Sequence, residues 1–442
     1  MAEPTEHTSS FEPTKALGRA VLVAGVLALL AVIAGRFDLV VLAAPFAIGT
    51  AVSLARRPSR PPTVELSAAE PFVVEGGELS ATVGVGNPDT LPYDLALVRL
   101  QVPPWVKLRH SDRPYATTVA PGTFADIALD GRVMRWGRHR LGPVTAHAVV
   151  SDGLFVSQPA RAWVLPLRAY PAIEHFQADE AMPRAAGHVG GHRSRRPGEG
   201  GELAGVRRFG PGDRLRRIDW RVSLRTREIH VVATLSDRDA EVVVLLDVLH
   251  EAGVSGGIEG AASVLDTTVR AAAGIAEHYL HRGDRVSMLQ YGFQVRKLRA
   301  GSGRRQYITA LEWLLDVAPA GHGGEPPSSM FGPHLVPVNA LVMVLTPLLD
   351  GRSAAMLANL SRAGRFVVAV DTLAEQRAAA ITGTRWAPLA QRLWMLEREN
   401  LIGQLREHGV PVVAWGGAGS LDEVLRGVAR GARARTASGA VG

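Results

Sequence analysis

Two uncharged apolar runs dominate the N-terminal part of the chain, at residues 20–35 and 39–55. Only Arg36, Phe37 and Asp38 separate them. As helices, the runs would each span about 24–26 Å at about 1.5 Å per residue, slightly less than a hydrocarbon core of about 30 Å. Because so short a polar break suits a tight turn, the pattern predicts a helical hairpin that crosses a membrane twice.

A cleaved signal peptide and a buried hairpin are the other interpretations of this segment. Three glutamates precede the first run, which does not suit the positive region of a signal peptide. The basic residues on the outer sides of the hairpin are Lys15, Arg19, Arg56, Arg57 and Arg60. Its loop contains only Arg36, so the positive-inside rule places both termini in the cytoplasm. The abundant Arg, Ala and Gly are typical of a GC-rich bacterial genome, so we expect a bacterial cell membrane protein with two spans.

Short alternating runs follow between residues 61 and 170, separated by turn residues such as Gly76-Gly77 and Pro121-Gly122. The runs cover residues 79–85, 95–102, 119–129 and 144–150. Strands at this spacing, without a helical pattern, predict a small all-β sandwich. Its polar residues are scattered, so we expect a spacer or docking module.

From residue 236 to the end, apolar runs alternate with helical patterns. Residues 241–248 are almost continuously apolar, as expected of a strand buried on both faces. Further strands are expected at 285–290, 340–346, 365–371 and 410–415, and helices at 261–281, 305–317, 353–363, 388–407 and 421–430. This alternation predicts an α/β domain with an open, mostly parallel, doubly wound sheet. Ligands bind such sheets at the carboxyl ends of the strands, where Asp247, Thr346 and Asp371 fall.

The connector between the two domains, residues 171–235, is rich in arginine. The chain has 49 Lys+Arg against 42 Asp+Glu, a net charge of +7, and residues 181–231 supply twelve arginines against five acidic residues. Nucleic-acid binding would require more aromatic residues than Phe209 and Trp220. Attraction to an anionic membrane leaflet is a second interpretation. Arg–carboxylate pairing, structural or with a partner, is the third and the favoured one.

Several classes of chemistry are excluded by composition. The chain has no cysteine, which excludes disulfides, thiolate nucleophiles and cysteine-containing metal sites. None of the three lysines lies in a Gly-Lys-Ser/Thr context, which excludes a P-loop. Neither a Gly-x-Ser-x-Gly nor a His-Glu-x-x-His motif occurs. We therefore propose no catalytic residue.

The second half of the connector has an ordered pattern, GELAGVRRFGPGDRLRRIDWRVS, from residue 201 to 223. Pro-Gly-Asp is a turn and helix-start signal, so Asp213 is expected to cap the segment that follows. We expect Arg217, Asp219 and Trp220 to pack as a knot that locks the segment against its domain. The residues of this signature that we single out for interaction are Gly212, Asp213, Arg216, Arg217, Asp219, Trp220 and Arg221.

This pattern closely resembles the signature of the bacterial domain-of-unknown-function family fifty-eight. Residues 136–143, 152–155 and 167–171 resemble other parts of that family, so the resemblance covers nearly the whole chain. It implies a C-terminal domain like a von Willebrand factor A domain. Members are often encoded beside MoxR-type AAA+ ATPases, which implies such an ATPase as partner. The resemblance implies no enzymatic activity.

A von Willebrand factor A domain holds a divalent cation with Asp-x-Ser-x-Ser after its first strand, and with a Thr and an Asp from later loops. Here Asp247 is present, but Leu249 and Glu251 replace the two serines. Leu249 cannot ligate Mg²⁺, whereas Glu251 and a later Asp350 have the oxygen atoms that this cation prefers. Asp247 remains a single candidate metal ligand, with helix capping or pairing to an arginine as the alternative. No cofactor is expected unless Asp247 binds Mg²⁺.

The sequence thus predicts a cytoplasmic tail with two transmembrane helices (1–60), a β-sandwich (61–170), the connector (171–235) and a von Willebrand factor A-like α/β domain (236–442). The function we expect is that of a membrane-anchored cytoplasmic adaptor without catalytic activity. Two alternatives stay open. One is a metal-dependent enzyme that uses Asp247, Asp371 and the arginines on an anionic substrate, and the other is a protein that senses anionic lipids.

Overall fold

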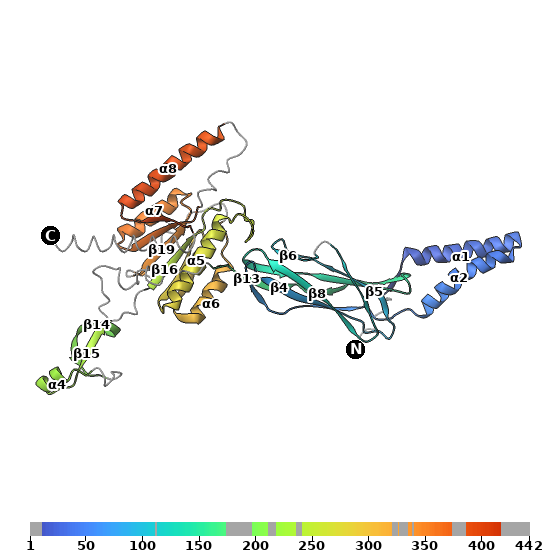
Figure 1. Cartoon of the computed structure of the whole chain (residues 1–442), viewed down its shortest axis with the longest axis horizontal. Coiled ribbons are helices and arrows are strands. Elements are labelled where there is room, and N and C mark those ends of the chain that lie inside the picture. The colour runs from blue at the N-terminus through green and yellow to red at the C-terminus, as the bar shows by residue number, and fades with distance from the viewer. Residues whose placement is uncertain are drawn as a thin grey trace, which may run out of the picture. The chain divides into compact units, whose positions relative to one another are not determined.

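The computed structural model describes residues 11–110, 113–173, 197–210, 218–235, 241–320, 326, 335–337, 340–373 and 386–416. The chain divides into two compact units, Met1–Tyr170 and Pro171–Gly442. The first unit contains a pair of helices and a set of β-sheets, and the second contains a β-hairpin and an α/β sheet (Figure 1).

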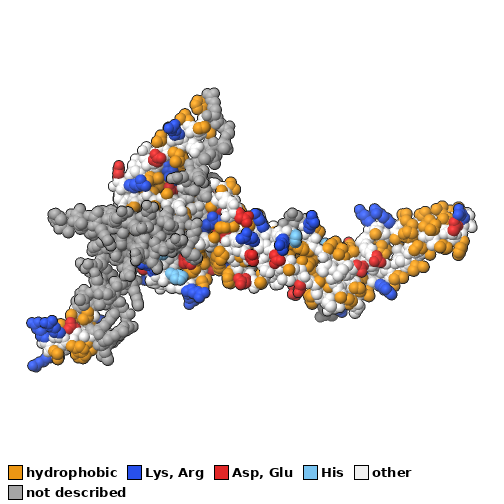
Figure 2. Space-filling view, viewed as in Figure 1, with side chains coloured by type: hydrophobic (Ala, Val, Ile, Leu, Met, Phe, Trp, Pro, Cys, Tyr) orange, Lys and Arg blue, Asp and Glu red, His pale blue; other side chains and the backbone are white. Residues whose placement is uncertain are grey.

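The helical pair consists of α1 (Lys15–Ala34) and α2 (Phe37–Ala55). Gly35 ends α1 with a left-handed backbone, φ 61°, that favours glycine. In the short loop, the Arg36 guanidinium forms an ion pair of 2.6 Å with Asp38. The side chains of both helices are mostly apolar and exposed (Figure 2). With mean hydropathies of 2.4 and 1.9, both helices are long and apolar enough to cross a membrane.

The β-strands of the first unit form three sheets around one core. One sheet contains β1 (Phe11–Pro13), β11 (Phe155–Ser157), β10 (Val144–Val150), β5 (Tyr93–Leu100) and β7 (Tyr115–Val119), with β12 (Ala160–Ala162) beside β10. The second contains β2 (Thr63–Ala68), β4 (Glu78–Gly86), β8 (Phe124–Val133) and β6 (Val106–Leu108). The third contains β3 (Phe72–Val74), β13 (Leu165–Tyr170) and β9 (Gly137–Leu141). Strands such as β4 and β10 bury alternate residues, because side chains alternate between the two faces of a strand.

Two predictions for this unit are wrong. Residues 119–129 are not one strand, because Val119 ends β7 and Gly122, with φ 65°, turns the chain before β8. The segment before α1 is not only a tail: β1 pairs with β11, and Phe11 is fully buried beside Tyr93. A strand of three residues is too short to show an alternating pattern in the sequence.

The second unit begins with a β-hairpin that carries a short helix. Strand β14 (Pro197–Arg208) pairs antiparallel with β15 (His230–Leu235), and α4 (Trp220–Thr226) lies between them in sequence. Most of the glycine-rich half of the connector, residues 174–196, lies outside the described residues.

The second unit also contains a six-stranded sheet in the order β18-β17-β16-β19-β20-β21. Neighbouring strands are parallel except β18, which is antiparallel to β17. The strands are β16 (Glu241–Asp247), β17 (Arg285–Tyr291), β18 (Arg296–Gly301), β19 (Leu341–Thr346), β20 (Phe366–Asp371) and β21 (Val412–Ala414). The central strands are buried almost throughout, which explains their continuous apolar runs.

Helices cover both faces of this sheet. They are α5 (Val264–His281), α6 (Gly303–Leu314), α7 (Gly351–Arg362) and α8 (Ala387–Glu407). Leu357 of α7 and Leu405 of α8 share a core cluster with Val243 and Leu245 of β16. The residues between them in β16, such as Val244, therefore face the other side, where α5 contacts the sheet.

The elements predicted for the α/β domain match the described ones to within three residues at each end. The edge strand β18 was not predicted, and the predicted helix at 421–430 lies outside the described residues.

Candidate functional site

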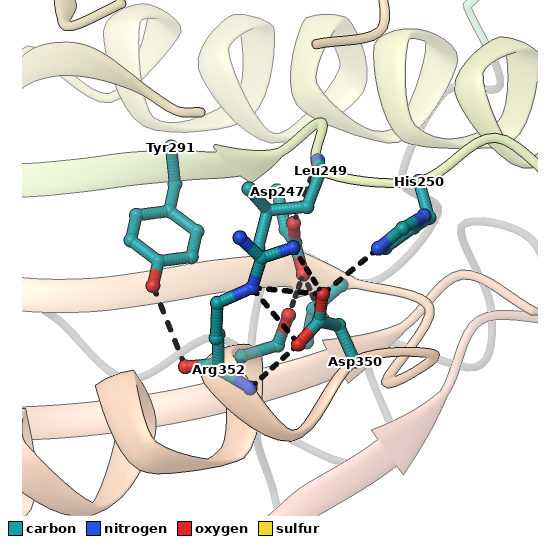
Figure 3. A network of polar contacts seen from close by, with 8 residues as sticks. Asp247, Leu249, His250, Tyr291, Asp350 and Arg352 are labelled. Carbon is teal, nitrogen blue, oxygen red and sulfur yellow. Dashed lines mark hydrogen bonds and ion pairs between the residues drawn. The ribbon is translucent and has the colours of Figure 1, made fainter. Parts of the chain in front are cut away.

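A buried carboxyl group lies at the carboxyl end of β16. Asp247 is 3% exposed and ends this strand. Its Oδ2 accepts hydrogen bonds from the hydroxyl groups of Thr346 and Ser353, both at 2.6 Å. Its Oδ1 accepts one from the backbone N–H of Leu249 at 3.1 Å (Figure 3). Both carboxyl oxygens are thus held by the protein itself.

The fold brings these groups together from distant parts of the sequence. Thr346 ends β19, which runs parallel to β16, so the two strand ends meet at one edge of the sheet. Asp350 caps α7 by accepting a hydrogen bond from the backbone N–H of Arg352, which places Ser353 in the first turn of the helix. Burial raises the pKa of Asp247, although the hydrogen bonds from Ser353, Thr346 and Leu249 oppose this rise.

A second carboxyl group, Asp350, lies at the rim of the same edge. Its Oδ2 binds the Arg352 guanidinium at 2.6 Å and the His250 ring at 2.8 Å. The hydrogen bond from Arg352 is the main cause that holds the pKa of Asp350 well below its usual range. The side chains of His250 and Arg352 are 49% and 34% exposed, so this rim meets solvent. We call these three residues the rim triad.

A third carboxyl group ends β20. Asp371 forms an ion pair of 2.5 Å with Arg398 of α8, and its Oδ1 accepts a hydrogen bond from the backbone N–H of Leu373. Both side chains of the pair are nearly buried. Beside it, the hydroxyl groups of Thr268 and Thr372 bond at 3.1 Å and link α5 to this end of β20. The ion pair fixes α8 to the sheet.

The residues around Asp247 do not fit a divalent cation. Glu251 instead caps the start of α5, where its Oε1 accepts a hydrogen bond from the backbone N–H of Leu265. Among the described residues, no three His, Asp or Glu side chains gather in a way that could hold a metal. The hydroxyl groups of Thr346 and Ser353 donate to Asp247, whose two carboxyl oxygens together accept three hydrogen bonds from the protein. These residues therefore do not form an Mg²⁺ site of the von Willebrand factor A kind.

The signature of the connector is described only in part. Gly212, Asp213, Arg216 and Arg217 lie outside the described residues, so the capping role expected of Asp213 stays a prediction. Asp219 caps α4, with its Oδ1 accepting hydrogen bonds from the backbone N–H groups of Arg221 and Val222, each at 3.1 Å. Trp220 is 64% exposed and Arg221 is also exposed. The expected knot is therefore wrong for Trp220, because the first residue of this capped helix faces solvent.

One pair of the kind favoured for the connector occurs among its described residues. The Arg208 guanidinium binds Glu228 at 2.8 Å, across the hairpin formed by β14 and β15. The side chains are 77% and 48% exposed, so this ion pair contributes little to stability.

Sequence reasoning found Asp247, Thr346 and Asp371 at the strand ends, and the structure places all three at the same edge of the sheet. It missed Ser353 and Arg398 as partners of these carboxyl groups. Ser353 follows the capping residue Asp350 by three positions, a spacing that indicates the first turn of a helix. Nothing in the sequence indicated Arg398, because its partner lies 27 residues earlier.

Comparison with solved structures gives only distant likenesses. A fragment of alpha-2-macroglobulin from Escherichia coli matches 26% of this chain and 17% of that chain, with 21% identity and a TM-score of 0.22. The CARDB domain of the PF1109 protein from Pyrococcus furiosus matches 25% of this chain and 88% of that chain, with 13% identity and a TM-score of 0.18. At these TM-scores, the likenesses carry no functional inference.

Comparison of sequences is more informative. One uncharacterized protein of Mycobacterium bovis and two of Mycobacterium tuberculosis are each 32% identical to this chain over 139 residues. The match covers 31% of this chain and 43% of each relative, less than half of their length. Residues 205–384 match the family described as protein of unknown function DUF58. This region, which contains α4 and the carboxyl group of Asp247, is therefore the part of the chain that is similar to the DUF58 family.

Proposed function

We propose that this protein is a membrane-anchored cytoplasmic adaptor that presents the rim triad, His250, Asp350 and Arg352, to a protein partner. Its partner would be a MoxR-type AAA+ ATPase, as the family resemblance implies. In this proposal, the helical pair anchors the protein and the α/β domain binds.

The observation that carries this proposal is how the three carboxyl groups at the sheet edge are bound and how far their partners are exposed. Asp247 is bound by two hydroxyl groups, and Asp371 is bound by Arg398, so both are internal supports. In the rim triad, by contrast, His250 and Arg352 both bind the carboxylate of Asp350 and are themselves partly exposed to solvent. Charged groups held in place at an exposed rim suit the recognition of a complementary surface.

The strand order supports a von Willebrand factor A-like α/β domain. Counted along the sequence, the six strands lie in the order third, second, first, fourth, fifth, sixth, and the third strand is the antiparallel edge. This is the order of a doubly wound sheet, in which ligands bind at the carboxyl ends of the strands. The rim triad lies at that end, next to Asp247 and Thr346.

The membrane anchor is supported by the exposed apolar surface of α1 and α2 and by their basic flanks. Apolar helices with so little burial would be costly to expose to water. Lys15 and Arg19 lie before the hairpin and Arg56, Arg57 and Arg60 after it, which favours a cytoplasmic position for both ends.

Affinity purification of the full-length protein from detergent, with and without ATP, tests this function. We expect the AAA+ ATPase to be retained by the wild-type protein. Retention should fall at least about tenfold in Arg352→Ala, because in this proposal Arg352 pairs with a charge on the ATPase, and truncating one partner of a charge pair across an interface costs about 2 kcal/mol or more of binding. Arg299→Ala, an exposed arginine on β18, is the matched control and should retain the ATPase. Failure to retain any AAA+ ATPase would contradict the proposed function.

A further inference from the structure

Helix α8 and the residue before it carry an apolar stripe whose side chains are each more than half exposed. Its residues are Trp386, Leu389, Leu393 and Leu396, with exposed fractions of 59%, 53%, 55% and 52%. They follow one another at intervals of three, four and three, which is the spacing of the a and d positions in a coiled coil. We call these four residues the α8 stripe. A large contiguous apolar surface of this kind indicates an interaction site.

The α8 stripe faces away from the sheet. Helix α8 is attached to the sheet by the ion pair of Arg398 with Asp371, and by Leu405, which is 4% exposed in the core. At about 100° per residue, the stripe lies about 160–240° around the helix from Arg398. The described residues therefore contact α8 on a face other than the stripe, and the N-terminal half of α8 extends from the α/β domain (Figure 1).

Two opposite charges flank the α8 stripe. Arg392 and Glu397 are exposed on either side of it and have no ion pair among the described residues. With Leu393 at an a position, Arg392 takes a g position and Glu397 the next e position. In a parallel pair of helices, a g residue lies beside the e residue five positions later on the other helix, where opposite charges attract. In an antiparallel pair centred on this stripe, the two Arg392 side chains would lie together and repel.

We propose that the α8 stripe pairs with the α8 stripe of a second copy of this chain, in parallel. Leu393 packs against its own counterpart, and Arg392 of each copy binds Glu397 of the other in two equivalent ion pairs. This is a self-complementary interface of the kind that twofold symmetry requires. The proposal does not depend on the ATPase or on the rim triad.

A cysteine cross-link tests this pairing directly, because the chain contains no cysteine. In the full-length protein, Leu393→Cys places two thiols side by side on the symmetry axis, within the separation of about 4.4–6.8 Å between Cα atoms that a disulfide requires. Under mild oxidation, we expect most of this variant to run as a dimer on a non-reducing gel. Glu399→Cys is the matched control, since it is exposed on α8 outside the stripe, and it should cross-link at least about fivefold less.

Charge reversal tests the direction of the pairing. In the Leu393→Cys background, Arg392→Glu or Glu397→Arg should each reduce the rate of cross-linking severalfold, and the two together should restore it. Equal cross-linking of Leu393→Cys and Glu399→Cys would overturn the proposal, because another part of the chain or another partner would then cover the stripe. A mixture of Leu389→Cys and Leu393→Cys that forms mainly mixed disulfides would also overturn it, because it would show an antiparallel pair.

Discussion

At the residue scale, the carboxyl groups of this protein are distinguished by what surrounds them. Asp247 is buried among hydroxyl groups, and its pKa is raised by burial. Asp350 is held by a guanidinium group, and its pKa is lowered. The two groups are close enough that Asp350 contributes to the raised pKa of Asp247. Asp247 therefore stabilises the interior of the domain, whereas Asp350 is part of the charged rim.

Ser353→Ala is expected to destabilise the protein by about 1–3 kcal/mol, because it removes a hydroxyl group that bonds to the buried Asp247. The measurement is the midpoint of denaturant unfolding of the full-length protein in detergent. Ser361→Ala on the same helix removes an exposed hydrogen bond to the backbone of His408 and is the control. An equal loss of stability in both variants would mean that the hydrogen bond to Asp247 contributes no more than an exposed one.

Asp89 is expected to make stability depend on pH. It accepts hydrogen bonds from the backbone N–H groups of Ser59, Arg60, Thr90 and Leu91. Burial raises its pKa, but these four bonds outweigh burial and lower the pKa to about 2. Because this value lies below the ordinary pKa of about 3.9, the stabilisation is present above pH of about 4 and is lost as the pH falls towards 2.

Thermal unfolding of the wild-type protein and of Asp89→Asn between pH 2 and 6 measures this effect, with the wild-type protein losing more of its stability on acidification. Asp130→Asn, an exposed change on β8, is the control and should follow the wild-type protein. Parallel curves for the wild-type protein and Asp89→Asn would contradict the prediction.

At the element scale, the helices of the α/β domain differ in how their N-termini are capped. Helix α5 begins with a complete capping box, in which the Ser263 hydroxyl accepts from the Asp266 backbone and the Asp266 carboxylate accepts from the Ser263 backbone. Ser302 precedes helix α6 at the N-cap position, but its side chain forms no capping hydrogen bond. A serine thus occupies the N-cap position of both helices but forms a capping hydrogen bond only in α5. Replacing each serine by alanine therefore measures the contribution of that hydrogen bond.

Ser263→Ala should cost about 1 kcal/mol of stability, within the usual range of about 0.5–2 kcal/mol for the loss of an N-cap. Ser302→Ala should change stability by less than about 0.5 kcal/mol, as expected of a substitution away from such features. Denaturant midpoints of the two variants and the wild-type protein provide the comparison. A larger loss in Ser302→Ala than in Ser263→Ala would reverse the expected order.

The sequence predicted long, periodic elements well and short ones poorly. The buried strand β16 and the amphipathic helix α5 have enough residues to show their patterns. Strand β1 has three residues, and β18 has only partly buried or exposed side chains with no clear alternation. The partners of Asp247 and Asp371 also escaped prediction, because Ser353 and Arg398 reach them only through the packing of α7 and α8.

At the scale of the whole molecule, the proposed function assigns anchoring to one unit and binding to the other. The first unit contains the apolar helical pair, and the second contains the rim triad and the α8 stripe. In the proposed function, the protein thereby holds a soluble partner at a membrane. Under this proposal, the orientation of the helical pair in the membrane decides which side of the membrane the partner occupies.

A reporter fused after Gly442 should be active only in a cytoplasmic assay, because the basic flanks of the hairpin favour the inner side of the membrane. A reporter inserted between Arg36 and Asp38 is the control and should be active only outside. If the C-terminal fusion were active outside, binding to an intracellular ATPase would be physically impossible.

The strand β1 has a practical consequence for the design of truncated proteins. The chain leaves the sandwich at Pro13, passes through both helices and returns through Arg57, whose guanidinium donates to the backbone oxygen of Phe11 and lies over the Phe155 ring. A soluble fragment that starts after residue 56 would therefore lose Phe11 and leave a hole beside Tyr93. Joining residues 11–13 to residue 57 through a short flexible loop would remove the helices and keep the sandwich filled.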